Sequence, residues 1–296
     1  MQRYKILSLV VGADRNIQPR GVTHNQASIP SAQLFTGSNV WSVKDTRKSN
    51  IRVNGDTVRC CIEGCCLLPS GDIVLADNGN HNLKKLNDMY QVISVCYMSD
   101  KPYGVCYIDN NTAAVTLNSN KLQFVDIRGG MTLTKSVDAG HPCRGVTYLN
   151  NQLYVIDNRS VYIYSKDGIK QRILYTHNFD MTSFKNIALS DDGSLIYISN
   201  WIRKLTTIDS SGNHLHTFTD SESGEVSGVC VDGEGHVLVS YQGSYKILQF
   251  SSDGKKKLGI ISGPDCIYWA RTLCFDKENT TLVVAGADDN INVLKL

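Results

Sequence analysis

A segment of roughly forty residues recurs six times along this chain, and this repeat restricts the fold more than any other feature of the sequence. Each copy begins with a short apolar run, whose first residue serves as the anchor of the repeat. The anchors are Gly64, Gly104, Gly145, Asn186, Gly228 and Thr272, at steps of 40, 41, 41, 42 and 44 residues. Two further apolar runs follow each anchor, as in DIVLADN from Asp72 and LKKLN from Leu83. A repeat of about 40–50 residues that holds several strands is typical of a β-propeller blade.

The apolar runs have the composition of β-strands, although helical repeats can have the same length. They are short, rich in Val, Ile, Leu, Tyr and Thr, and bounded by Gly, Asn, Asp and Ser. Turn-forming pairs such as Ser70-Gly71 and Asp192-Gly193 separate the first run from the second, where a hairpin needs a tight turn. No segment has a sustained apolar period of about 3.6 residues. The sequence therefore predicts an all-β, six-bladed propeller.

A propeller blade normally has a fourth, outer strand. Five repeats offer one, at Gln91–Cys96, Thr132–Val137, Gln171–Thr176, His214–Thr219 and Lys256–Ile261. The sixth repeat offers none, because the sequence stops at Leu296 with the third run. Native β proteins avoid an exposed edge of this kind. We therefore expect an N-terminal strand, Ser49–Asn54, to pair with Ile291–Leu296 and close the ring.

The first part of the chain differs from the repeats. Residues 1–38 contain Pro19, Pro30 and several Ser and Asn residues, so we expect a linker or loosely ordered tail there and a propeller over residues 39–296. The apolar run Ile6–Ala13 is short for a signal peptide, and no run is long enough to span a membrane. The formal net charge of +2 neither requires nor excludes a polyanionic partner. We expect a cytoplasmic protein.

Ten cysteines suggest metal chemistry until they are placed on the repeat. Four of them fall two residues after an anchor, in four different repeats: Cys66, Cys106, Cys230 and Cys274. The other two repeats have Thr and Ala at that position, so the site takes a small, slightly polar side chain. Zinc ligands would need a C-x-x-C spacing that is absent. We expect reduced, structural thiols, no metal and no cofactor.

The sequence has none of the common catalytic motifs. It lacks a G-x-S-x-G elbow, a Walker phosphate loop, H-E-x-x-H and a glycine-rich dinucleotide turn. Some six-bladed propellers of the gluconolactonase and paraoxonase type are calcium-dependent hydrolases that use acidic and amide side chains in the channel. Here the starts of the inner runs offer few carboxylates beyond Glu63 and Glu225. We therefore predict that the chain is not an enzyme, with a calcium-dependent lactonase or esterase as the less favoured alternative.

Binding through the loops is better supported. In a propeller, the loops that lead into the first strand of each blade and those that join its second and third strands emerge on one face, around the channel mouth. Arg, Lys and aromatic side chains in such loops suit a protein hot spot or a surface that stacks on single-stranded RNA. The candidate partner-binding residues are Arg59, Lys101, Tyr103, Arg144, Arg159, Lys185, Trp201, Arg203, Tyr241, Tyr245 and Arg271. Acidic residues on the same face, such as Asp77 and Asp288, weaken the positive field and favour protein over RNA.

The chain resembles a known family in several of these runs. LPSGDIVLADNGNHNLKKLN (Leu68–Asn87), SDDGSLIYISNW (Ser190–Trp201) and GVCVDGEGHVLVS (Gly228–Ser240) are similar to the NHL-type propeller at the C-terminus of tripartite-motif proteins, above all the invertebrate and molluscan members. The resemblance covers about residues 49–296 and is most specific in the Asp-Gly turn and in the Asp-Asn pairs that end the second strand. It departs from the family where other residues replace that Asp, at Leu117, Tyr241 and Gly286.

The resemblance implies a role in a ubiquitin-ligase system. Members of this family commonly carry RING, B-box and coiled-coil parts before the propeller, and this sequence contains none of them. It therefore resembles the substrate-recognition part alone. The partner that we expect is a protein substrate or adaptor, with single-stranded RNA as the alternative. We expect no membrane partner and no small-molecule cofactor.

Overall fold

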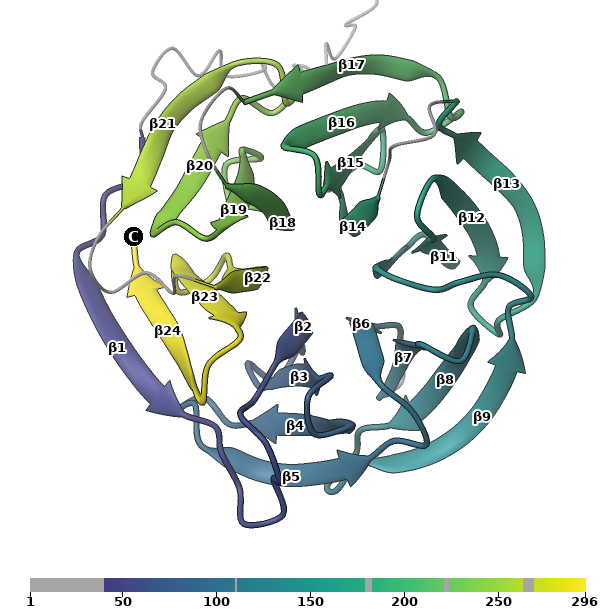
Figure 1. Ribbon diagram of the computed structural model, residues 1–296, viewed down its shortest axis with the longest axis vertical. Helices are drawn as coiled ribbons and strands as arrows, with labels where there is room; N and C mark the ends of the chain where they lie inside the picture. Colours follow the sequence, from purple (N-terminus) through teal and green to yellow (C-terminus); the bar gives the residue numbers. More distant parts are fainter. Residues whose placement is uncertain (1–39, 110, 179–182, 221–223, 263–268) are drawn as a thin grey trace, which may run out of the picture. The chain divides into compact units, whose positions relative to one another are not determined.

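The structure is a computed structural model that describes residues 40–109, 111–178, 183–220, 224–262 and 269–296. Its strands form six four-stranded antiparallel sheets, which are the blades of a ring around a central channel (Figure 1). The predicted all-β, six-bladed propeller is confirmed. Within the described ranges there is no helix long and apolar enough to cross a membrane. The tail predicted for residues 1–38 lies outside the described residues.

The blades share one plan, in which the chain passes from the channel outward (Figure 1). The inner strands are β2 (Ile62–Leu67), β6 (Pro102–Tyr107), β10 (Val146–Leu149), β14 (Phe184–Leu189), β18 (Glu225–Val231) and β22 (Ala270–Asp276). The second strands are β3 (Ile73–Asp77), β7 (Thr112–Leu117), β11 (Gln152–Ile156), β15 (Leu195–Asn200), β19 (Val237–Gln242) and β23 (Thr281–Gly286).

The third strands are β4 (Asn82–Leu86), β8 (Lys121–Asp126), β12 (Ser160–Ser165), β16 (Lys204–Asp209), β20 (Lys246–Phe250) and β24 (Asn290–Lys295). The outer strands are β5 (Val92–Tyr97), β9 (Thr132–Asp138), β13 (Lys170–Thr176), β17 (His214–Thr219), β21 (Lys257–Ser262) and, for the sixth blade, β1 (Asp45–Asn50). The five outer strands predicted within the repeats agree with the observed bounds of β5, β9, β13, β17 and β21 to within one residue at each end. The glycines of the predicted hairpin turns have positive φ, 84° at Gly71 and 72° at Gly193, as such turns require.

The N-terminal strand closes the ring, as predicted. β1 pairs antiparallel with β24, with Ser49 opposite Ile291. The strand lies four residues earlier than the prediction, because the chain leaves the sheet at Ile51. That residue is fully buried, and its N–H donates to the carbonyl of Asp289 at 2.8 Å.

The glycine anchors mark the places where inner strands of neighbouring blades come close together. A Cβ atom added to Gly64 would lie 2.5 Å from the carbonyl oxygen of Tyr103, and one added to Gly228 would lie 2.8 Å from Cα of Thr272. Any side chain at these positions would force adjacent blades apart. Glycine therefore recurs at the anchor because a neighbouring backbone occupies the space of its side chain.

Hydroxyl groups on the second strands join neighbouring blades at the same level. Ser199 Oγ accepts the N–H of Asn186 at 2.9 Å and donates to the carbonyl of Ser227, in the next blade, at 2.5 Å. Thr116 and Ser240 likewise each accept an N–H of their own blade and donate to a carbonyl of the next blade. Apolar clusters fill the spaces between blades, which explains why the inner and second strands are apolar on both faces.

Candidate functional site

Irregularities at the start of the inner strands direct one side chain per blade to the channel mouth. In five blades the pairing between inner and second strand slips at the anchor, for example between Ile62 and Gly64 in β2 and between Ala270 and Thr272 in β22. Such a β-bulge bends the strand and re-aims the extra residue. Each slip includes the residue that immediately precedes the anchor. In the third blade that residue is Arg144, whose N–H donates to the carbonyl of Ile156 at 2.8 Å.

We call these six residues, one before each anchor, the mouth ring: Glu63, Tyr103, Arg144, Lys185, Ser227 and Arg271. Its members contact one another across blade boundaries. Arg271 of the sixth blade forms an ion pair with Glu63 of the first. The guanidinium carbon of Arg144 lies 4.3 Å from the ring centroid of Tyr103. A cation over an aromatic face contributes about 0.5–1 kcal/mol at exposed sites and more when water is excluded.

Trp201 joins the mouth ring from the turn between β15 and β16. The ammonium of Lys185 lies 3.8 Å from the centroid of its ring. Of the eleven predicted partner-binding residues, the structure therefore brings five together at the mouth: Tyr103, Arg144, Lys185, Trp201 and Arg271. These five come from four different blades.

Two cations of the mouth ring have no carboxylate partner. Neither Arg144 nor Lys185 is in an ion pair within the part of the chain that the structure describes. Burial is the largest influence on Lys185 and lowers its pKa; Arg144 and Arg271 lower it further, while Glu63 and Glu225 act in the opposite direction. The Nε of Arg271 is buried without a hydrogen-bond acceptor among the described residues. The mouth ring thus presents two partly buried cations, Arg144 and Lys185, that form no ion pair among the described residues, although Glu63 lies nearby.

The side chains of the mouth ring leave little space between them. The space enclosed by Glu63, Tyr103, Arg144 and Lys185 has a volume of about 10 Å³, which is about enough for one water molecule. A small organic ligand does not fit into this space. A side chain of a macromolecule can instead contact the ring from outside.

Beyond the mouth ring the channel widens into a cavity of about 370 Å³, lined by inner strands of all six blades. Its lining combines aliphatic side chains, Thr hydroxyls and the thiols of Cys65, Cys66, Cys106, Cys230 and Cys274. At the strand ends away from the mouth ring, Lys277 forms an ion pair with Asp191. The cavity is large enough for a small molecule.

Burial favours the neutral thiol form of Cys66, Cys106 and Cys230 in the cavity. Burial raises the pKa of Cys106 to about 12 and raises the pKa of Cys66 and Cys230 well above the ordinary value. The nine cysteines in the described ranges are all free. The four equivalent cysteines are therefore unpaired thiols, as predicted. They also line the channel, which the repeat pattern does not indicate.

Five predicted partner-binding residues lie on exposed loops that surround the mouth ring: Arg59, Lys101, Arg159, Arg203 and Tyr245. Arg59 is in an ion pair with Asp288 at 2.6 Å, so an acidic neighbour on the same face already offsets its charge. These residues can extend an interface but are not part of the central contact network.

Tyr241 has to be removed from the candidate set. Its side chain is 4% exposed and packs with Tyr197 and Leu205 in the apolar cluster between the fourth and fifth blades. The sequence comparison assigned it to the turn after the second strand, but β19 continues through Gln242. Position 241 therefore belongs to the strand, and its side chain points into the core.

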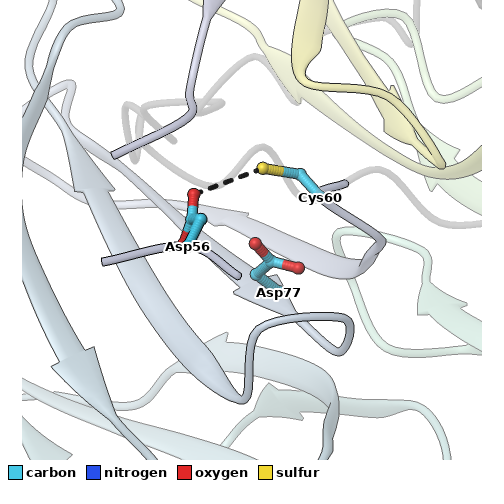
Figure 2. Close-up of side chains that lie close together, drawn as sticks. All are labelled: Asp56, Cys60 and Asp77. Atoms are coloured by element: carbon cyan, nitrogen blue, oxygen red, sulfur yellow. Dashed lines mark hydrogen bonds between the residues drawn. The ribbon is translucent and has the colours of Figure 1, made fainter. Parts of the chain in front are cut away.

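A second group of ligand-type side chains lies inside the first blade, among Asp56, Cys60 and Asp77 (Figure 2). Their oxygen and sulfur atoms lie within 4.8 Å of one another, which is close enough to hold a metal ion. The ammonium of Lys84 occupies the centre of this group, 2.6 Å from Asp56 Oδ2, 2.8 Å from Asp77 Oδ2 and 3.0 Å from Cys60 Sγ. A protein cation thus takes the place that a metal ion would need, and the cluster is a buried ion-pair network.

Sequence reasoning missed Glu63 as the partner of Arg271, and it missed Ser227 as the sixth member of the mouth ring. Both occupy the position before an anchor, which the repeat alignment identifies for Arg144, Lys185 and Arg271. A survey of that position in every blade would have found them. The candidate residues at that position were limited to cations and aromatic residues, so the carboxylate of Glu63 and the hydroxyl of Ser227 were left out.

The fold is similar to that of solved propeller enzymes. Virginiamycin B lyase from Staphylococcus aureus matches with a TM-score of 0.63 and 15% identity, over 85% of this chain and 99% of that chain. A luciferin-regenerating enzyme matches with a TM-score of 0.67 and 15% identity, over 85% and 96%. A catalytically inactive variant of the lyase with quinupristin matches with a TM-score of 0.63 and 14% identity, over 85% and 100%. No family model and no curated protein matches the chain.

These matches contradict the prediction that the chain is not an enzyme. Structures with this fold include a lyase and a luciferin-regenerating enzyme, so the lack of common catalytic motifs does not exclude catalysis. At 15% identity the likeness shows the fold alone and identifies no reaction for this chain. The three structures named above are a lyase, its inactive variant and a luciferin-regenerating enzyme, so they do not test the finer resemblance to tripartite-motif propellers, which stays a prediction.

Proposed function

We propose that the mouth ring is the centre of a protein-recognition surface, on which an acidic side chain of the partner contacts Arg144 and Lys185. The observation that carries the proposal is that both cations lie over aromatic rings and neither has a carboxylate partner within the described residues. Arg and aromatic residues are the commonest anchors of protein interfaces. The buried Nε of Arg271 adds a donor without an acceptor at the same place.

The shape of the mouth supports a macromolecular ligand. The space of about 10 Å³ among Glu63, Tyr103, Arg144 and Lys185 is too small for an organic ligand, whereas the exposed loops around the ring can widen a contact with a macromolecule. The aromatic rings hold the two cations in place, so little side-chain entropy is lost when a partner binds. Within this proposal, the resemblance to tripartite-motif propellers suggests a substrate or adaptor of a ubiquitin-ligase system as the partner.

A displayed library of random peptides tests this proposal, with a double variant, Arg144→Glu with Lys185→Glu, as the comparison. The matched control is Arg128→Glu, because Arg128 is exposed, pairs with Asp126 and lies between β8 and β9 on the opposite face. We expect the wild type and the control to select peptides rich in Asp and Glu, and the double variant to lose them. Selected peptides that bind all three proteins equally would contradict the proposal.

Single-stranded RNA is the alternative outcome on the same surface. Binding of poly-U RNA is measured over a range of salt concentrations with the same three proteins. Neutralised phosphates release counterions, so RNA binding falls steeply with salt, whereas a protein contact made by a few anchors weakens modestly. Submicromolar, salt-steep binding of the RNA that is lost only in the double variant would replace the protein partner with RNA.

Catalysis on a small molecule is a second candidate, favoured by the cavity of about 370 Å³ in the channel. It is tested with a panel of aryl esters and lactones, with and without Ca²⁺. The substitution Cys106→Trp fills the cavity from β6, and the Arg144→Glu and Lys185→Glu double variant serves as the matched control. Turnover that is lost only with Cys106→Trp would support chemistry in the channel.

A further inference from the structure

Cys60 and Lys84 bring a thiol and an amine into direct contact inside the first blade. The Nζ of Lys84 lies 3.0 Å from Sγ of Cys60. Lys84 is 0% exposed and Cys60 is 1% exposed. Figure 2 shows Cys60 beside Asp56 and Asp77, the two carboxylates that flank the amine. This pair is separate from the mouth ring and from the thiols of the channel cavity.

Hydrogen bonds from several segments hold the two atoms at this distance. Asp56 accepts the N–H of Val53 at 2.9 Å as well as the Lys84 ammonium. Asp77 accepts the N–H of Cys61 at 2.9 Å, so the residue after Cys60 is fixed to β3. The N–H of Cys60 itself donates to Asp289 Oδ1 at 2.8 Å. Neither Cys60 nor Lys84 can move away without breaking buried charged contacts, so the two atoms stay in contact while the blade is folded.

We propose that Cys60 and Lys84 are the site of an oxidative modification, a covalent bridge in which one oxygen atom joins Lys84 Nζ to Cys60 Sγ. An N–O–S bridge keeps nitrogen and sulfur close to their present separation. A direct N–S bond would instead require the two atoms to approach much further. The existing geometry therefore favours the oxygen-bridged product within this packed interior.

Dioxygen is the oxidant and supplies the bridging atom. The amine, the thiol and one molecule of dioxygen give the N–O–S bridge and one molecule of water. The nitrogen and the sulfur each give up two electrons, which together reduce both oxygen atoms. The ammonium form of Lys84 first loses a proton, which Asp56 or Asp77 can accept because both lie within hydrogen-bond distance of Nζ.

The surroundings set the rate of this reaction. Burial raises the pKa of the Cys60 thiol, and its neighbours Asp56 and Asp77 hold the pKa of Lys84 above its ordinary value despite burial. The reactive neutral amine is therefore a minor form, so the bridge forms slowly. Dioxygen is small and apolar, and it reaches the pair during local opening of the loop before β2.

Intact-mass spectrometry of the folded protein after prolonged incubation under air tests the proposal. We expect a gain of one oxygen atom less two hydrogen atoms, and return to the original mass with dithiothreitol. Peptide mapping should give one cross-linked product that contains Cys60 and Lys84. The substitution Cys60→Ser should abolish the mass change, and Cys96→Ser, which removes another buried thiol, should leave it unchanged.

Three results would overturn the proposal. One is an unchanged mass of the wild-type protein at the end of the incubation. Another is a gain of whole oxygen atoms on Cys60, which indicates sulfenic or sulfinic acid instead of a bridge. The third is a disulfide that contains Cys60. Peptide mapping of the wild type decides the matter even if Cys60→Ser does not fold.

Discussion

The two groups of charged residues in this propeller differ in whether their charges are matched. In the first blade, the ammonium of Lys84 contacts two carboxylates and a thiol, and the side chains of the ion pairs are fully buried. At the channel mouth, Arg271 pairs with Glu63, while Arg144 and Lys185 lie against aromatic rings and contact no carboxylate among the described residues.

Under the proposed function, this difference in charge matching separates a structural role of the Lys84 network from a binding role of the mouth ring. A buried charge with complete partners has nothing left to offer a ligand, and it fixes the segments that supply those partners. A cation that is partly desolvated but unmatched gains energy when an anion arrives. The neighbouring carboxylates of Lys84 raise its pKa, whereas burial and nearby cations lower the pKa of Lys185. The comparison can be tested by removing the charges of each group in turn.

The largest effect is expected from Lys84→Met. Asp56 and Asp77 would then be buried without a cation, which costs about 3–5 kcal/mol of unfolding free energy. Urea denaturation measures the change. The control Arg128→Met removes an ion pair with Asp126 in which the Arg128 side chain is 70% exposed, and it should leave the unfolding free energy nearly unchanged. Equal losses in the two variants would show that the buried network is not structural.

The penalty of Lys84→Met should shrink in acid. Burial would raise the pKa of Asp77, but hydrogen bonds from the Cys61 N–H and Lys84 lower it overall. In the wild type, the stability that Asp77 contributes is present above the unfolded pKa of about 3.9 and is lost as pH falls through the lower folded pKa. Without Lys84 the buried carboxylates favour protonation, so acid relieves the variant. A penalty that is constant between pH 7 and about 4 in urea titrations would contradict this account.

At the mouth, Arg144→Ala should act on binding instead of stability. We expect the affinity for a selected acidic peptide to fall by about 30-fold or more, the loss typical of an interface hot spot. The melting temperature should stay the same, because the side chain of Arg144 is not part of a buried ion pair. Calorimetric titration and thermal denaturation of the same preparation give both values. A lower melting temperature with unchanged affinity would reverse the assignment.

The smallest effect is expected from Tyr103→Leu, which removes the ring beneath Arg144. The loss of one cation–π contact should weaken peptide binding about two- to fivefold. Arg128→Ala is the control, because Arg128 lies on the opposite face of the propeller and this variant should bind the peptide as the wild type does. If both variants bind equally well, the aromatic rings do not position the cations.

The fold could be predicted because its main constraints repeat in the sequence. Glycine at the anchor reports contact between neighbouring backbones, and turn glycines report hairpins, so the alignment of repeats predicts strands and blades together. The closing strand lies at Asp45–Asn50 instead of Ser49–Asn54, because the burial of Ile51 and its bond to Asp289 depend on a loop of the sixth blade. Contacts between chain ends leave no local pattern in the sequence.

The candidate site could be predicted in part, for related reasons. The position before the anchor identified Arg144, Lys185 and Arg271, because a bulge recurs there in most blades. Tyr241 was misplaced because the end of the second strand was set two residues too early, before Tyr241 instead of after Gln242. The Lys84 network was missed entirely. Its partner Asp56 lies before the first repeat, so no comparison between repeats could indicate the contact.

The bulges also determine how this molecule can change over evolutionary time. In the four blades with a glycine anchor, the anchor carries the packing constraint, while the residue beside it faces the channel mouth. Packing between blades and contact with a ligand therefore depend on different residues. Substitutions at the mouth ring can exchange charge, size or hydrogen-bonding capacity without changing the close backbone contact at the glycine anchors. Duplicated copies of such a gene can diverge in ligand preference through point mutations at six positions, one for each blade, while they keep the same framework.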